Sequence, residues 1–154
     1  MKTEKNKAGK KQSRAKEPLV VNGLKIHCRG RIGDGGMYVE SGINGFIGIF
    51  IGRTELKHFS ISIQDAADLS GAIKAITKLQ NRNVNLDVVG GVFAVNVYVD
   101  YSDVGYYKKN GDIFLLEQGV TLTIPQTEQL ADFLLEAAEH TKAHVAELER
   151  RGAR

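Results

Sequence analysis

The sequence of 154 residues has few of the features that mark secreted and membrane proteins. It has one cysteine, Cys28, so an internal disulfide cannot form. No run of about 18 apolar residues occurs, so no membrane-spanning helix is expected. The polar, basic N-terminus also lacks the apolar segment of a secretory signal. These absences together predict a cytoplasmic or nucleoid-associated protein that is not secreted and has no membrane partner.

Catalytic and metal-binding signatures are also missing. The glycine-rich segment 30–36 is not followed by Lys-Ser/Thr at a helix start, so it is predicted to be a turn and not a phosphate-binding loop. His140 and His144 have a spacing that can bind a metal, but no Cys/His cluster completes the site. Neighbours on a strand point to opposite faces, so Cys28 and His27 cannot form a nucleophile–base pair. The sequence therefore predicts a protein that is not an enzyme and that binds neither a metal ion nor a cofactor.

The sequence does contain one pattern that occurs twice, 61 residues apart. Residues 59–76 read FSISIQDAADLSGAIKAI, and residues 120–137 read VTLTIPQTEQLADFLLEA. In each copy an alternating run typical of a strand is followed by an apolar stripe with helical spacing. Two copies are too few for a solenoid, so a pair packed about a pseudo-twofold axis is the simpler interpretation.

The segments before each copy are predicted to be strands, which gives an α+β fold. Each half is expected to be a ββββα unit, in which a curved antiparallel sheet is followed by one helix that covers one face. Asp65 is the expected N-cap of the first helix, and Pro125 opens the second. The predicted strand runs are 24–32, 37–40, 46–53 and 57–63 in the first half and 84–89, 92–101 with an extension over 105–109, 112–117 and 120–124 in the second.

Charge is distributed unevenly along the chain. The net charge is +3, yet residues 1–17 carry seven basic and two acidic side chains, and the remaining residues carry 14 basic and 16 acidic ones. Residues 1–17 are predicted to be a disordered basic tail, which either binds phosphate or aids solubility. The first folded unit then spans 18–79 and the second spans 84–150. Because these two units together carry a small net negative charge, they can bind nucleic acid only where basic side chains are locally concentrated.

The sharpest local signal is a row of basic residues in the run 24–32. Lys25, His27, Arg29 and Arg31 alternate with apolar residues, so they are predicted to lie on one face of one strand, about 6.5–7 Å apart. That spacing is close to the phosphate repeat of an extended single strand of nucleic acid. A merely solvated strand face is the alternative interpretation.

Aromatic residues are few and tryptophan is absent, so base stacking would depend on Tyr, Phe or Arg. Tyr106, Tyr107, Lys108 and Lys109 form a basic and aromatic patch beside an Asn-Gly hairpin signal, and only one of the two tyrosines can point outward. The alternative is one core tyrosine and two lysines that protect a sheet edge. Tyr98, on the polar face of its strand opposite Val99 and Tyr101, is a further candidate for stacking, and the alternative is that it lies under a neighbouring hairpin. Arg53, Lys57 and His58 flank a turn and are secondary candidates.

These features resemble the single-stranded-DNA-binding coactivator family typified by positive cofactor four, and related folds occur in the whirly and PUR nucleic-acid-binding families. The segment KKNGD, followed by GVTLTIPQTEQLADFLLEA, is similar to that family's turn, last strand and helix. The resemblance covers roughly 92–140, with a weaker counterpart over 24–79, and departs where the family has a Trp early in the helix. It implies a single strand running across the sheet faces, with cations on phosphates and aromatics on bases. It also implies a dimer, formed by the two copies in one chain or by two chains.

The sequence therefore predicts a non-enzymatic nucleic-acid-binding protein that prefers single-stranded DNA, with RNA left open, and that acts in transcription, replication or recombination. A homo-oligomer is also expected. The alternative is a structural or interaction module that oligomerises through its helices and apolar strands.

Overall fold

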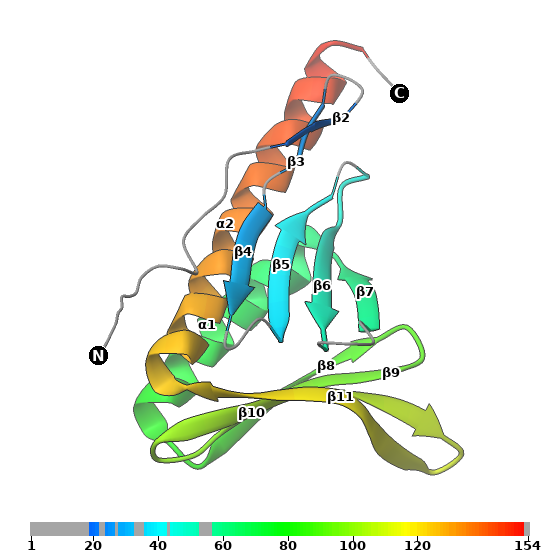
Figure 1. Ribbon diagram of the computed structural model, residues 1–154. Coiled ribbons are helices and arrows are strands. Elements are labelled where there is room, and N and C mark those ends of the chain that lie inside the picture. The colour runs from blue at the N-terminus through cyan, green and yellow to red at the C-terminus, as the bar shows by residue number, and fades with distance from the viewer. Residues whose placement is uncertain are drawn as a thin grey trace.

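The computed structural model describes residues 19–21, 24–26, 28–32, 36–42, 44–52 and 57–152, with residues 19–32 described by their backbone alone (Figure 1). It contains two four-stranded antiparallel sheets, each followed by one helix. The α+β class with two antiparallel sheets and two helices is therefore confirmed. The first sheet and its helix comprise β4 (Cys28–Ile32), β5 (Met37–Ser41), β6 (Ile47–Ile51), β7 (Lys57–Ile61) and α1 (Ile63–Leu79). The second comprises β8 (Arg82–Val88), β9 (Gly91–Val97), β10 (Tyr101–Asn110), β11 (Ile113–Thr123) and α2 (Ile124–Arg150).

The predicted arrangement of two equivalent ββββα repeats agrees with the structure only in part. The predicted strand 24–32 divides into β3 (Leu24–Ile26), which pairs with β2 (Leu19–Val21) in a separate two-stranded sheet, and β4. The runs 112–117 and 120–124, predicted as two strands, are one strand, β11, because the chain continues through a register shift at Glu117. A single extra residue lets a strand bend without ending. The prediction was therefore wrong at both places.

Both helices begin at a hydroxyl N-cap. The Ser62 side chain accepts a hydrogen bond from the Asp65 backbone N–H at 3.0 Å, so Ser62 and not Asp65 is the cap of α1. Thr123 accepts from the Gln126 N–H at 3.2 Å, and the Gln126 side chain accepts from the Thr123 N–H at 2.9 Å, which completes a capping box. These bonds satisfy donors that would otherwise be unpaired at the helix ends.

Each sheet has a buried inner face and an outer face that neither helix covers. Val39, Ile49 and Ile61 belong to the inner row of the first sheet, and Val95 and Val104 to that of the second. They form a single hydrophobic cluster with residues of both helices. The core is therefore shared by the two halves of the chain.

The helices pack across the two halves. α1 lies against β8 and β9 of the second sheet, whereas α2 lies against β4, β5 and β6 of the first sheet and also contacts β10 and β11 (Figure 1). The helices contact each other, and the buried Ser70 hydroxyl of α1 donates to the Ala131 carbonyl of α2 at 2.6 Å. Each sheet therefore depends on a helix from the other half.

The joint between α1 and β8 contains two non-glycine residues with positive φ. Asn81 has φ 51°, which Asn tolerates, but Gln80 has φ 64° and ψ 157°, a region that only glycine occupies readily. We expect Gln80→Gly to stabilise the fold by about 1 kcal/mol, because relief of strain exceeds the entropy that glycine loses on folding. Urea denaturation measures this change. Asn81→Gly is the control, and an equal effect at both positions would contradict strain at Gln80.

Candidate nucleic-acid interface

Three rings stack across the outer face of the first sheet. The strand register places Tyr38 of β5 opposite Phe50 of β6, and Phe50 opposite His58 of β7. The Tyr38 and Phe50 ring centroids are 4.4 Å apart with planes 4° apart, and those of Phe50 and His58 are 4.3 Å apart at 17°. His58 is exposed at the end of this row. The rings therefore form a face-to-face stack whose last ring, His58, is exposed.

The absence of a side chain at Gly48 leaves room for the Phe50 and His58 rings. A Cβ atom at Gly48 would stand 3.2 Å from the Phe50 ring, 3.3 Å from His58 Nε2 and 3.7 Å from Glu40 Cγ. Partial burial beneath this group raises the pKa of the Glu40 carboxyl above its ordinary value, and the nearby His58 partly offsets the shift. The rings and Glu40 thus form one compact group on the outer face.

The outer face of the second sheet is polar in its middle. The register aligns Asn83, Asn96, Asp103 and Thr121 in one row across the four strands. The Thr121 hydroxyl donates to Asp103 Oδ1 at 3.0 Å. Amide and hydroxyl groups in such a row can hydrogen-bond to the edges of bases.

A pair of tyrosines lies at one end of this face. The ring centroids of Tyr98 and Tyr101 are 4.9 Å apart, and the side chains are 37% and 43% exposed. The prediction that Tyr101 and Val99 share the buried face of a strand is wrong, because β9 ends at Val97 and the chain turns before β10. The turn closes with a hydrogen bond from the Tyr98 N–H to the Tyr101 carbonyl at 2.8 Å.

The basic and aromatic patch at 106–109 is divided between the core and the surface. Tyr106 is 2% exposed, and its hydroxyl donates to the Val89 carbonyl at 3.1 Å. Tyr106 is therefore the one of the two tyrosines that points inward, and its ring belongs to the core beside Phe59. Tyr107 points to the outer face and is half-buried, and Lys108 and Lys109 are exposed.

Lys57 is engaged within the molecule. Its Nζ lies 3.5 Å from Glu117 Oε1 and 4.6 Å from the centre of the Tyr106 ring. Its side chain is 33% exposed, so it joins β7 to the edge of the second sheet. A phosphate at Lys57 would compete with these two contacts.

The predicted row of basic residues does not lie on one strand. Lys25 belongs to β3, while Arg29 and Arg31 belong to β4 in another sheet, and the register of β4 shifts between Cys28 and Arg31. Local alternation could not reveal this break, since both pieces alternate. His27, Arg53 and the tail 1–17 lie outside the described residues. Nucleic-acid contact by these residues stays a prediction.

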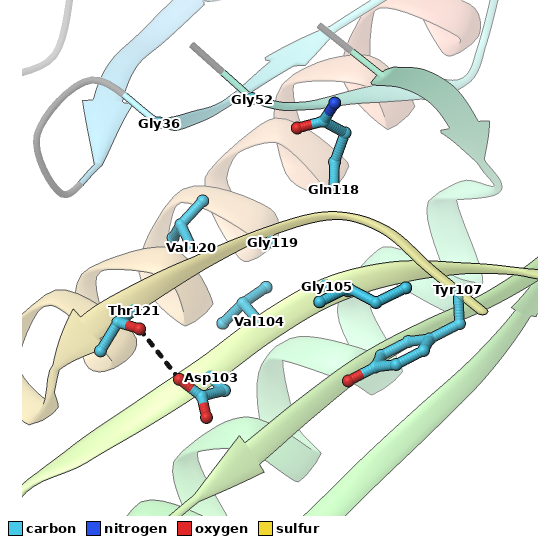
Figure 2. A pocket seen from close by; sticks show the side chains of 11 residues that line it. Gly36, Gly52, Asp103, Val104, Gly105, Tyr107, Gln118, Gly119, Val120 and Thr121 are labelled. Carbon is cyan, nitrogen blue, oxygen red and sulfur yellow. Dashed lines mark hydrogen bonds between the residues drawn. The ribbon is translucent and has the colours of Figure 1, made fainter. Parts of the chain in front are cut away.

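A depression of about 740 Å³ lies along the edge of β11, which faces the ends of β5 and β6. Gly36 and Gly52 form its far side, and Gln118 points from β11 toward Gly52 (Figure 2). Asp103 and Tyr107 lie on the other side of β11 in the same view. The depression is thus bordered by both sheets.

Sequence reasoning missed Tyr38, Phe50 and Tyr101. Pairing the predicted hairpins around the turn at 41–45 would have placed Tyr38 opposite Phe50, because register follows from turn length. No sequence signal near Tyr101 indicated that the preceding strand ends at Val97.

Among the described residues, no group of three metal-ligating side chains occurs, and no helix is long and apolar enough to cross a membrane. The His140 and His144 rings lie 6.3 Å apart, and His140 Nδ1 is 3.2 Å from the Ser41 hydroxyl of β5. These histidines therefore lie where α2 meets the first sheet.

Comparison of the chain with protein-family models, with curated proteins and with solved structures found no match. The resemblance to single-strand-binding families stays a prediction, and a function has to be inferred from the geometry.

Proposed function

We propose that this protein binds single-stranded nucleic acid on the outer faces of its two sheets and has no catalytic activity. The observation that carries the proposal is the presence of accessible aromatic rings on both uncovered faces: the row that ends at His58 and the Tyr98–Tyr101 pair. A base can stack on any aromatic face, which suits recognition without strong sequence preference. Single-stranded DNA is the ligand that we expect to bind best, with RNA as the comparison.

The second outer face offers a track for a short strand. Tyr101 and Tyr107 are six residues apart on β10, which corresponds to about 20 Å along a strand. Asn96 and Asp103 lie between these ends and present polar groups. Lys109 follows Tyr107 on the same face and is exposed, so it is placed to meet a phosphate.

We also propose that the two halves are related by a pseudo-twofold axis. The caps Ser62 and Thr123 are 61 residues apart, which equals the offset of the sequence repeat. Ser70 and Ala131 are separated by the same number and contact each other. In a twofold arrangement equivalent residues meet at the axis, so Ser70 and Ala131 mark its position. The two outer faces would then be paired parts of one binding surface.

The proposal is tested by fluorescence anisotropy with labelled single-stranded DNA, single-stranded RNA and duplex DNA over a range of salt concentrations. The logarithm of affinity for single strands should fall with the logarithm of salt concentration, with a slope of about 0.7 for each phosphate contact. Absence of binding to all three ligands at low salt would refute the proposal. Tighter binding to the duplex would exclude the preference for single strands.

Replacing both Tyr98 and Tyr101 by Ala should weaken binding by roughly 5- to 150-fold, since a stacked base contributes about 1–3 kcal/mol. The variant with Phe at both positions keeps the rings and should bind like the wild type. Leu79→Ala, at an exposed position on α1, is the control for loss of an apolar surface residue. Unchanged affinity in the Ala variant would place the stacking site elsewhere.

A further inference from the structure

Four consecutive apolar residues of β11 are exposed near the end of the β10–β11 hairpin. Ile113, Phe114, Leu115 and Leu116 are 49–59% exposed, although they belong to a regular strand. Contiguous exposed apolar residues with polar neighbours are typical of protein interfaces. Neither nucleic-acid stacking nor the shared core uses this apolar segment, 113–116.

The apolar segment lies at an open sheet edge. β11 is the terminal strand of the second sheet, and among the described strands only β10 pairs with it. Its outward N–H and C=O groups therefore have no strand partner in the part of the chain that the structure describes. An exposed apolar edge readily pairs with another strand.

The exposed side chains occur on both faces of the hairpin. Phe114 pairs with Lys109 and Leu116 with Tyr107, which places these two on the outer face, and Ile113 and Leu115 point the opposite way. A partner that covered one face would leave half of the segment exposed. A second strand added at the edge brings side chains together on both faces.

We propose that two copies of this protein form a twofold dimer in which their β11 edges pair in antiparallel register centred on Leu115. In an antiparallel pair, two directly opposed residues point their side chains to the same face of the sheet, and their backbone N–H and C=O groups point either both toward or both away from the other strand. Neighbouring residues of one strand differ in both respects, so a twofold axis between two identical strands must set one residue opposite its own copy. This register sets Leu115 against its copy and Phe114 against Leu116 of the second copy. The two second sheets then join into one continuous sheet.

The ends of the apolar segment favour this register. The strand residues that pair in it are Ile113 to Glu117, because Gly111 and Asp112 form the turn before β11 and Glu117 is the extra residue of the β11 bulge. Glu117 comes opposite Ile113, but its carboxylate is already held toward Lys57 at 3.5 Å. Centring the pair on Phe114 would pair only Ile113 to Leu115, because the chain turns at Asp112. The helices cannot supply an equivalent surface from their main apolar stripes, which lie in the shared core.

Sedimentation velocity over a range of protein concentrations tests the proposal. The wild type should be a dimer, and Phe114→Glu should shift it to a monomer with at least roughly 30-fold weaker association, as expected for a central interface residue. Val89→Glu, at a loop residue that is 87% exposed, is the matched control and should leave the dimer intact. A monomeric wild type, or a dimer that Phe114→Glu leaves unchanged, would overturn the proposal.

A cysteine on the axis tests the register. Leu115→Cys in a Cys28→Ser background should form a disulfide-linked dimer on mild oxidation, because opposed strand residues lie within disulfide range. Val89→Cys in the same background should stay monomeric on denaturing gels. A dimer without this crosslink would refute the Leu115 register. A third outcome is a monomeric wild type that loses oligonucleotide binding on Phe114→Glu. That result would show that the apolar segment contacts nucleic acid, and it would overturn the proposed dimer.

Discussion

Gly91→Ala is expected to destabilise the protein by at least about 3 kcal/mol, because the new methyl group has no space. A Cβ atom at Gly91 would overlap the Tyr107 carbonyl oxygen and stand 3.0 Å from the Tyr107 carbonyl carbon and 3.2 Å from Lys108 Cα. These are backbone atoms of the paired strand β10, so they can move only if the β9–β10 pairing opens. Urea denaturation followed by circular dichroism measures the change.

Gly71→Ala is the matched control for this substitution. Gly71 lies in α1, and a Cβ atom there would meet nothing within 4 Å. Replacing a helical glycine by alanine should therefore stabilise the protein by about 0.5–1 kcal/mol. The same chemical change should thus have opposite signs at the two positions. Equal stability of Gly91→Ala and the wild type would contradict the register of β9 against β10.

The second large effect is expected on dividing the chain between Gln80 and Asn81. Neither fragment should fold alone, because α1 lies against β8 and β9 and α2 lies against β4, β5 and β6. Leu69 and Ile73 of α1 are almost fully buried, and losing each such contact removes about 1.5–3 kcal/mol from a total stability of about 5–15 kcal/mol. An equimolar mixture should regain secondary structure and cooperative unfolding, which circular dichroism detects.

The control for the divided chain is an uncut protein with a short Gly/Ser insertion at the same joint. Lengthening a connection has a small effect on stability, so this variant should fold. If the fragment that begins at Asn81 unfolded cooperatively by itself, the second sheet would not need α1. The two halves would then be independent domains.

The elements themselves could be predicted because their signals are local. Alternation identified the strand that ends at Ile61, and helical spacing identified the buried Leu69 and Leu130. The helix cap was misassigned by three residues, since Ser62 and Asp65 are both good cap residues. Local chemistry therefore predicts the type of an element better than its ends.

The candidate site was harder to predict because it depends on pairing between distant segments. Tyr38, Phe50 and His58 share a row only through the register of three strands. Lys57 was predicted to be available for phosphate, but its partner Glu117 is 60 positions away in the sequence, so no local pattern pointed to it. Tyr106 and Tyr107 could be divided into one inward and one outward ring, but only the fold shows which is which.

The position of α2 has a consequence for how the protein is made. The inner row of the first sheet, which includes Val39 and Ile49, is synthesised well before the helix that covers it, since α2 ends at Arg150. Until α2 has left the ribosome this surface has no cover, and exposed apolar strands of a nascent chain are prone to aggregate. The growing chain should therefore be a substrate for a ribosome-associated chaperone, and release from the chaperone should follow the emergence of α2.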